Sequence, residues 1–429
     1  MSNHNNPKNT LQIIEWQSIS SNDIQNIVDD KTKAEKIFDE LKKFASEEHN
    51  HAFITIIKAG KALKARNYVG LIQTKSGFCL EILPKINDKD SLAKQGESTK
   101  TLLVEMLKTL RNFPAKASNF SNLNTSKTPL LEIFIQMFLN ELIILIKKGI
   151  KSNYQSMQKN RFYLKGKLLF SQHIKHNLTH QERFYTSSDE YSPNIPQNRL
   201  IKSTLELFSK ISLGAKTQSL LRECYFVFND IPTSENIDKD FNSCHNDRSL
   251  KYYKIVLLWC KVFLRKQNFA PYGGNTVAIA LLFDMNYLFE SYVAHHLKSH
   301  RQDWDISAQD RGKYLLQNDF CALRPDIVAT KDNETIILDT KWKKIESQKD
   351  IAVSDIYQMW AYVSKYKSEK TILLYPKIGD FQGKTSFVFK PNNPGNVSLE
   401  VAFVDLTLKI EAEIKKIFEK FQKTDETKQ

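Results

Sequence analysis

Two aspartates and a lysine stand at the ends of two short apolar segments in RPDIVATKDNETIILDTKWKK, residues 324–344. Asp339 and Lys341 are two residues apart, so on a strand their side chains point to the same face. Asp326 lies upstream, and the polar turn at residues 331–334 can fold its strand back beside the second one. The spacing therefore predicts that Asp326 approaches Asp339 and Lys341.

Paired carboxylates beside a lysine suit metal-dependent hydrolysis of a phosphodiester. Mg²⁺ prefers a few carboxylates together with water and phosphate oxygens. The ion lowers the pKa of bound water and neutralises charge in the transition state. We therefore expect Asp326 and Asp339 to hold Mg²⁺, with Mn²⁺ as the alternative ion. Lys341 would orient or deprotonate the attacking water, and all three residues would be catalytic.

Three further residues could complete this site. Glu290, in FDMNYLFESYV, lies on an apolar segment ahead of the two strands and could add a third metal-binding, catalytic carboxylate. Gln358 and Tyr362 are spaced i, i+4 on the helix expected after the lysine, so they share a face, and we expect Gln358 to be catalytic. The alternative is a set of solvated strand ends and polar helix faces. The apolar run at 335–338 favours a core strand instead.

The segments around these residues follow an order of helix, hairpin, helix and strand, which is typical of an α/β sandwich. The expected elements are a helix over 278–300, strands over 314–323, 326–330 and 335–341, a helix over 354–366, strands over 371–375, 381–390 and 397–406, and a helix over 409–423.

The first 270 residues show no such chemistry. The pattern predicts two strands within 67–86 around a Lys-Ser-Gly turn. The expected helices cover 29–48, 102–110, 130–146 and 252–266. The stretch NFAPYGGNT contains the Pro and Gly of a boundary. We therefore expect an α+β part, with a small β region and helices, over 1–270, and an α/β domain over 271–429.

The composition favours a nucleic-acid partner. Lys and Arg number 62 against 48 Asp and Glu, a formal net charge of +14, and such an excess favours polyanions. Five cysteines without a CxxC pair argue against a disulfide framework. The N-terminus lacks the apolar run of a signal peptide. Polar residues interrupt the most apolar segment, which starts at Leu130, so we expect a cytoplasmic protein without a membrane partner.

Two other patterns are weaker. GDFQGKT, from Gly379, has three residues between its glycines where a phosphate-binding loop needs four, and a strand-like SFVFK follows it. We therefore expect this chain to bind no nucleotide itself. His173, His176 and His180 share one face if their segment is helical, and zinc could use them. The absence of a convincing fourth ligand in the sequence favours a packing or contact face.

The ordered set of Glu290, Asp326, Asp339, Lys341 and Gln358 resembles the PD-(D/E)xK nuclease superfamily over residues 275–390. Longer blocks are similar to successive signatures of the McrC family, the nuclease subunits of McrBC methylation-dependent restriction systems. These blocks are NYVGLIQTKSGFCLEILPKI, LKGKLLFSQHIKHNLTHQERFYTSSDEYSPNIPQNRLIKSTL and LLFDMNYLFESYV.

The resemblance implies a PD-(D/E)xK restriction-endonuclease-like domain over 271–429 and a partner-docking region over 1–270. It implies a Mg²⁺-dependent DNA endonuclease subunit of a type IV restriction system. The partner would be a McrB-like AAA+ GTPase that forms a hetero-oligomer with this chain. The complex would act on double-stranded DNA containing modified cytosine, and this chain would stimulate GTP hydrolysis by the partner. The alternatives are a non-catalytic activator with an inactive nuclease fold and a stand-alone DNA repair nuclease.

Overall fold

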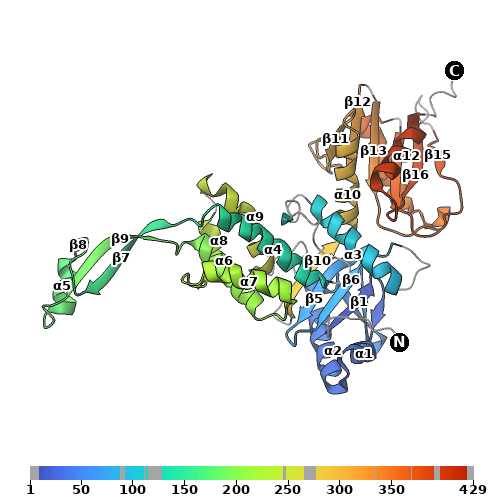
Figure 1. Cartoon of the computed structure of the whole chain (residues 1–429). Helices are drawn as coiled ribbons and strands as arrows, with labels where there is room; N and C mark the ends of the chain where they lie inside the picture. Colours follow the sequence, from blue (N-terminus) through green and yellow to red (C-terminus); the bar gives the residue numbers. More distant parts are fainter. Residues whose placement is uncertain are drawn as a thin grey trace. The chain divides into compact units, whose positions relative to one another are not determined.

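The computed structural model of the chain describes most of the sequence, in nine stretches. These are residues 9–86, 92–110, 113–114, 128–244, 248–264, 277–332, 334–368, 370–390 and 397–422. The chain forms two compact units. The first joins residues 1–131 to 267–429, and the second consists of 132–266 (Figure 1).

These units do not follow the linear division expected at residue 270. Residues 1–131 share a unit with the C-terminal part because strand β10 (Val277–Asp284) pairs antiparallel with β5 (Tyr68–Thr74). The Pro- and Gly-containing stretch at 271–276 lies outside the described residues. The assignment of residues 1–270 to partner docking stays a prediction.

The helix expected over 278–300 is wrong over its first seven residues, 278–284. The segment forms β10, and helix α10 (Met285–His300) begins only after Asp284, whose side chain caps it by accepting from the Asn286 N–H at 2.8 Å. A short apolar run such as AIALLF fits a buried strand as well as a buried helix. The open edge of β5 decides in favour of the strand.

The first sheet has the order β1-β6-β5-β10. Strands β5 and β6 (Cys79–Leu83) form the hairpin predicted within 67–86, and β1 (Thr10–Ile14) joins β6 in parallel. At Gly70, where φ is +133°, a Cβ would lie 2.0 Å from the carbonyl oxygen of Leu281. Only glycine therefore lets β5 approach β10 at this position.

A three-stranded sheet of order β2-β4-β3 shares one core with the first sheet and two helices. The strands are β2 (Ser18–Ile19), β3 (Ile54–Ile57) and β4 (Ala62–Ala65), and the helices are α1 (Ser21–Val28) and α2 (Lys31–Ser46). Ile37, Leu41 and Phe44 of α2 repeat at helical spacing and are fully buried. Helix α3 (Leu92–Thr109) follows.

Among the described residues, the largest sheet of the first unit has six strands in the order β11-β12-β13-β14-β16-β15. The strands are β11 (Asp305–Ala308), β12 (Ile327–Lys331), β13 (Glu334–Thr340), β14 (Lys370–Pro376), β15 (Ser386–Val388) and β16 (Ser398–Val404). Strands β13, β14 and β16 are parallel, and the other pairs are antiparallel.

Helices cover this sheet, which confirms the predicted α/β arrangement. Helix α11 (Val353–Tyr366) connects β13 to β14, and its Met359 and Tyr362 pack with Ile337 and Leu373 of the sheet. Helix α12 (Ile410–Gln422) contacts β16, and α10 contacts β13 and α12. The expected elements from residue 326 onwards are formed with small shifts at their ends, except that the strand expected over 381–390 is limited to β15 at Ser386–Val388.

The strand expected over 314–323 is not formed. Tyr314 bridges Ala322, and the Leu315 N–H donates to the Cys321 carbonyl at 2.9 Å, so the segment folds back on itself. Asn318 and Asp319 have positive φ angles of 58° and 56°. Both residue types tolerate this left-handed conformation, which ends an extended strand and makes a turn.

The second unit combines helices with a long β arm. The helices are α4 (Leu130–Lys147, from Glu132 in this unit), α6 (Pro196–Ser209), α7 (Ala215–Val227), α8 (Ile237–Ser243) and α9 (Lys254–Leu264). Phe138, Phe208 and Phe263 pack edge to face in their core. The described part of the chain has no helix with the length and apolar character needed to cross a membrane.

The arm of the second unit runs from residue 153 to residue 192. Strands β7 (Asn153–Arg161) and β9 (Phe184–Ser192) form its shaft, and β8 (Lys167–Leu168) and α5 (Phe170–Asn177) lie at its far end (Figure 1).

Candidate active site

The two predicted aspartates meet at one end of the β12–β13 hairpin. Asp326 precedes β12, and Asp339 is near the end of β13, next to the paired residues Ile327 and Leu338. Thr340 donates its backbone N–H and its hydroxyl to Asp326 Oδ2, at 2.7 and 2.8 Å. The hairpin thus brings both carboxylates together, as the sequence predicts.

Lys341 lies on the same face as Asp339. Its Nζ is 2.6 Å from Asp339 Oδ2, and Asp339 is 1% exposed whereas Lys341 is 26% exposed. The Lys341 N–H donates to the Leu374 carbonyl at 2.9 Å, which fixes the backbone against β14. The ammonium group therefore contacts a buried carboxylate and remains partly exposed to solvent.

Helix α11 supplies a second support for the lysine. Lys341 Nζ donates to Gln358 Oε1 at 3.2 Å, and Gln358 Nε2 donates to the Tyr362 hydroxyl at 2.7 Å. The same hydroxyl donates to the Arg324 carbonyl at 3.0 Å. These bonds form a continuous chain from Lys341 back to the segment that carries Asp326.

Glu290 of α10 reaches the same region. It lines a pocket of about 430 Å³ together with Tyr287, Gln309, Arg324 and Asp326. Burial, then the nearby Asp326 charge, raises the pKa of Glu290 to about 7, against a hydrogen bond with Gln309 that lowers it. A third carboxylate therefore faces the predicted pair.

The carboxylates are held in an environment that opposes their ionisation. Burial, followed by the charge of Asp326, raises the pKa of Asp339 to about 7, although Lys341 lowers it in part. Burial also raises the pKa of Asp326, against the two hydrogen bonds from Thr340. Asp339 Oδ2 is paired with Lys341 Nζ at 2.6 Å, which offsets part of the cost of its ionisation. A bound cation would offset this cost.

These residues fit a hard divalent ion such as Mg²⁺. Asp339 offers a buried carboxylate whose Oδ2 is paired with Lys341 Nζ, and Asp326 uses Oδ2 for Thr340, which leaves Oδ1 as its oxygen for a cation. Among the described residues, no group of three or more His, Cys, Asp or Glu side chains is placed to hold a metal ion, so the structure does not gather Glu290 with the two aspartates as a three-carboxylate site. Mg²⁺ usually takes its remaining ligands from water and phosphate, so two carboxylates beside a polar pocket suit it.

Comparison with known proteins identifies the family. Residues 63–376 match the family described as the McrBC 5-methylcytosine restriction system component, which is more than half of the chain. The chain belongs to this McrBC family. A relative from Escherichia coli (strain K12), the type IV methyl-directed restriction enzyme EcoKMcrBC, is 22% identical over 275 residues, covering 58% of this chain and 77% of the relative.

The fold of this McrBC family member also matches a solved structure. That structure is described as a refined half-complex from a tetradecameric assembly of Thermococcus gammatolerans McrB AAA+ hexamers with bound McrC. The match has a TM-score of 0.68 at 18% identity and covers 96% of this chain and 100% of the other. At this identity the likeness establishes the shared fold.

Three residues of the McrBC-family site were not predicted from the sequence. Thr340 stands between Asp339 and Lys341, and its hydroxyl and backbone N–H both donate to Asp326 Oδ2. Its place between the two predicted residues was the available signal. Arg324 directly precedes the Pro-Asp pair and could also have been noticed. Gln309 follows β11, and no sequence signal predicted that β11 pairs with β12.

The weaker sequence patterns have structural explanations in the McrBC-family fold. In GDFQGKT, Gln382 bridges Ser347, and a strand, β15, follows instead of a helix. His173 stacks on Phe184 and His176 stacks on Tyr185, so these rings pack α5 against β9.

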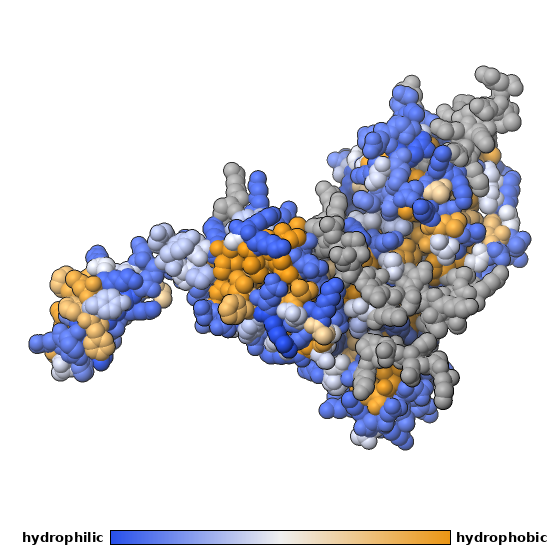
Figure 2. Space-filling view, viewed as in Figure 1, coloured by the Kyte–Doolittle hydropathy of each residue, from blue (hydrophilic) through white to orange (hydrophobic). Residues whose placement is uncertain are grey.

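The arm of this McrBC family member carries a second candidate functional surface. Eight large apolar or aromatic side chains on the arm are each more than 60% exposed, and Figure 2 shows apolar surface gathered at its far end. They are Tyr154, Phe162, Tyr163, Leu164, Phe170, Ile174, Leu178 and Tyr191. Exposed apolar surface of this extent marks a contact site for another protein.

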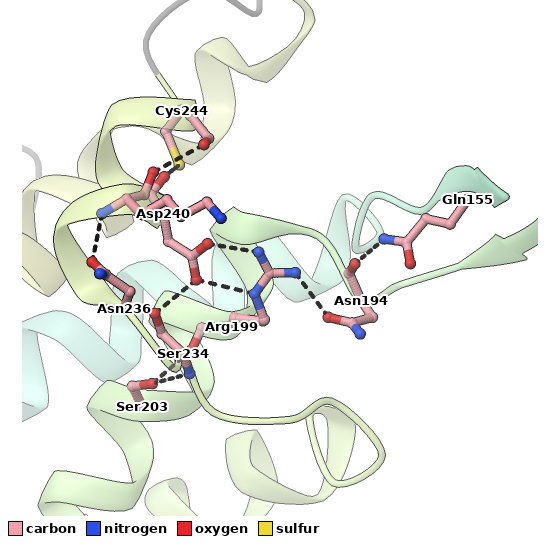
Figure 3. A network of polar contacts seen from close by, with 10 residues as sticks. Gln155, Asn194, Arg199, Ser203, Ser234, Asn236, Asp240 and Cys244 are labelled. Carbon is pink, nitrogen blue, oxygen red and sulfur yellow. Dashed lines mark hydrogen bonds and ion pairs between the residues drawn. The ribbon is translucent and has the colours of Figure 1, made fainter. Parts of the chain in front are cut away.

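Helix α6 fixes the base of the arm (Figure 3). Arg199 donates to both oxygens of Asp240, at 3.0 and 2.6 Å, and to Asn194 Oδ1 at 3.1 Å, while Gln155 of β7 donates to the Asn194 carbonyl. The neighbouring Asn198 donates to carbonyl groups on both sides of the arm, at residues 151 and 193, at 2.9 and 2.8 Å. The side chains of Asn198 and Arg199 thus hold the segments at which the chain enters and leaves the base of the arm.

Proposed function

We propose that this chain is the Mg²⁺-dependent DNA endonuclease subunit of a modification-dependent restriction complex. The observation that carries the proposal is the convergence of Asp326, Asp339 and Lys341 at one buried strand end in a McrBC-family chain. Buried carboxylates whose pKa values are raised by burial and by a neighbouring carboxylate cluster at functional sites. The arrangement therefore favours a catalytic role over an inactive nuclease fold.

Each side chain has a distinct task in phosphodiester hydrolysis. Asp326 and Asp339 would hold the ion, and Thr340 orients Asp326 through two hydrogen bonds. When bound, Mg²⁺ would supply Lewis-acid charge and a water of lowered pKa. Glu290, facing the same pocket, would hold a ligating water or add a direct oxygen.

Lys341 acts as a cation in this proposal. Burial lowers the pKa of Lys341, but the carboxylates of Asp339, Asp355 and Asp326 together outweigh burial and the net shift is upwards. A lysine with a raised pKa stays protonated at neutral pH, so it stabilises charge on the phosphate and orients the attacking water. It would therefore not serve as the general base. Gln358 and Tyr362 hold the ammonium group in place through the hydrogen bonds described above.

The proposed partner is a McrB-like AAA+ GTPase that recognises double-stranded DNA with modified cytosine. A solved structure of the same fold is described as McrB AAA+ hexamers with bound McrC, which supports such a partner here. We assign the contact to the arm, because its exposed apolar end needs a protein surface to cover it. The chain would stimulate GTP hydrolysis by the partner through this contact.

The test combines the purified chain with its McrB-like partner, GTP, Mg²⁺ and DNA carrying modified cytosines. The proposal expects cleavage that requires all components, loss of cleavage in Asp339→Asn, and retained stimulation of GTP hydrolysis by that variant. Cleavage by Asp339→Asn at the wild-type rate would remove the site assignment. Stimulation of GTP hydrolysis by the wild-type chain without any cleavage would instead favour the non-catalytic activator.

A further inference from the structure

A buried carboxylate from the N-terminal part of the chain contacts the segment that carries Lys341. Glu15 directly follows β1 and is 2% exposed. The indole N–H of Trp342 donates to Glu15 Oε1 at 2.7 Å, and the Lys85 N–H donates to the same oxygen at 2.8 Å. Trp342 is the next residue after the candidate catalytic lysine.

Three contacts fix Trp342 in place. In addition to the bond with Glu15, its backbone N–H donates to Asn286 Oδ1 at 3.2 Å, and its ring packs edge to face on Phe289 with centroids 5.4 Å apart. Asn286 and Phe289 belong to α10, which also carries Glu290. The indole therefore connects strand β1, helix α10 and the lysine segment.

Fold stability alone does not explain the carboxylate. Glu15 Oε2 has no hydrogen-bond partner among the described residues, and burial raises the pKa of Glu15 to about 7 despite the bonds from Lys85 and Trp342. Burying a polar oxygen without a partner costs roughly 1–3 kcal/mol, and an apolar side chain of similar size would avoid that cost. A carboxylate at this position is better explained by the orientation of the group that it binds.

We propose that Glu15 is a positioning residue for the nuclease centre, acting through Trp342 on Lys341. This inference rests on the proposed function. Loss of the Glu15–Trp342 bond leaves the segment after Lys341 held here by the Asn286 bond and the packing on Phe289, so the peptide between residues 341 and 342 is less firmly placed. A misplacement of ~1 Å at a catalytic group can reduce the rate by ~10²-fold. The bond also makes the nuclease centre depend on the correct folding of β1.

The test compares three variants of the full-length chain in complex with the McrB-like partner. Glu15→Leu removes the acceptor, Trp342→Phe removes the donor, and Glu15→Gln keeps Oε1 as an acceptor for both N–H groups. Trp304→Phe is the matched control, since Trp304 is 7% exposed in the same unit and Trp342 is 8% exposed. Single-turnover cleavage of modified-cytosine DNA is measured with GTP and Mg²⁺, alongside DNA affinity, GTP turnover and Tm.

We expect Glu15→Leu and Trp342→Phe to lose roughly 10- to 100-fold in cleavage rate, with DNA affinity and GTP turnover unchanged. Glu15→Gln and Trp304→Phe should stay within about threefold of wild type, an estimate from retained geometry. Cleavage by Glu15→Leu at the wild-type rate would overturn the inference. An equal loss in Glu15→Gln would also overturn it, because charge rather than the Oε1 acceptor would then matter.

A spectroscopic readout separates this inference from the proposed function. Protein labelled with 5-fluorotryptophan gives a ¹⁹F signal for Trp342, assigned by its absence in Trp342→Phe. That signal should shift in Glu15→Leu and remain in place in Glu15→Gln. A wild-type complex that does not cut DNA would refute the proposed function, whereas an unshifted signal in Glu15→Leu would refute the positioning role.

Discussion

Replacing Asp339 with asparagine should stabilise the metal-free protein above neutral pH. Asp339 is 1% exposed, and its pKa rises from an ordinary value of 3.8 to about 7, first through burial and then through Asp326. Asparagine has nearly the same shape and carries no charge to bury. Asp339→Asn should therefore remove the metal affinity of the site and raise the stability of the folded protein.

The size of the effect follows from proton linkage. Because the folded-state pKa lies above the unfolded-state value, the folded protein binds more protons between pH 3.8 and about pH 7, and its stability falls as pH rises through that window. About three pH units at ~1.4 kcal/mol each give a cost of about 4 kcal/mol above pH 7. The attraction to Lys341 is already included, because the lysine is one of the groups that lower this pKa.

The measurement is thermal unfolding in EDTA at pH 4.5 and pH 8.5. At ~2 °C per kcal/mol for a unit of this size, Asp339→Asn should melt several degrees above wild type at pH 8.5, and the difference should shrink at pH 4.5. Added Mg²⁺ should raise the Tm of wild type at pH 8.5 and leave the variant unchanged. Asp305→Asn, which alters an exposed carboxylate on β11, is the control and should show neither effect.

Two outcomes would refute this reasoning. The first is an Asp339→Asn variant that melts no higher than wild type at pH 8.5, since the buried charge would then cost nothing. The second is an equal gain at both pH values, which would assign the effect to packing rather than to ionisation.

Three further predictions concern the lysine, the arm and the units. Lys341→Ala should lose ~10²–10³-fold in cleavage rate and little Mg²⁺ affinity, because the side chain stabilises charge on the phosphate; a Mg²⁺ titration that shows the reverse would make it structural. Phe162→Ser and Leu178→Ser should weaken binding to the partner ~10-fold each without changing Tm, and unchanged affinity would contradict the assignment of the arm. A fragment of residues 132–266 should stimulate GTP hydrolysis by the partner, which GTP turnover tests. A fragment of residues 1–270 should aggregate, because the edge of β5 lacks its neighbour β10, and light scattering tests this.

Local spacing was sufficient to predict most of the candidate site. Asp339 and Lys341 share a face because strands alternate with a period of two, and the polar turn after β12 fixes how close Asp326 comes. Gln358 and Tyr362 share a face because four residues make about one helical turn. Each of these relations depends on residues within one short segment, so the sequence of that segment is enough to predict which side chains lie together.

Relations between distant segments could not be predicted in the same way. The AIALLF run has no periodicity that separates a buried strand from a buried helix, and only the free edge of β5 makes it a strand. The parallel pairing of β1 with β6 and the bond between Glu15 and Trp342 leave no local pattern. Gly70 was the one available signal, because glycine within a strand often marks close approach of another backbone.

The order of elements along the chain connects strand β10 of the first unit directly to the candidate active site. Residues 132–266 are inserted between two segments of that unit, and the chain returns through β10. Strand β10 continues directly into α10, where Asp284 caps the helix and also accepts from Asn67 beside β5. Helix α10 then presents Asn286 to Trp342 and Glu290 to the carboxylate pocket. A change in the register of β10 would therefore move two contacts of the candidate active site together, and the cleavage rate should respond to substitutions in β5 and β10 that never touch DNA.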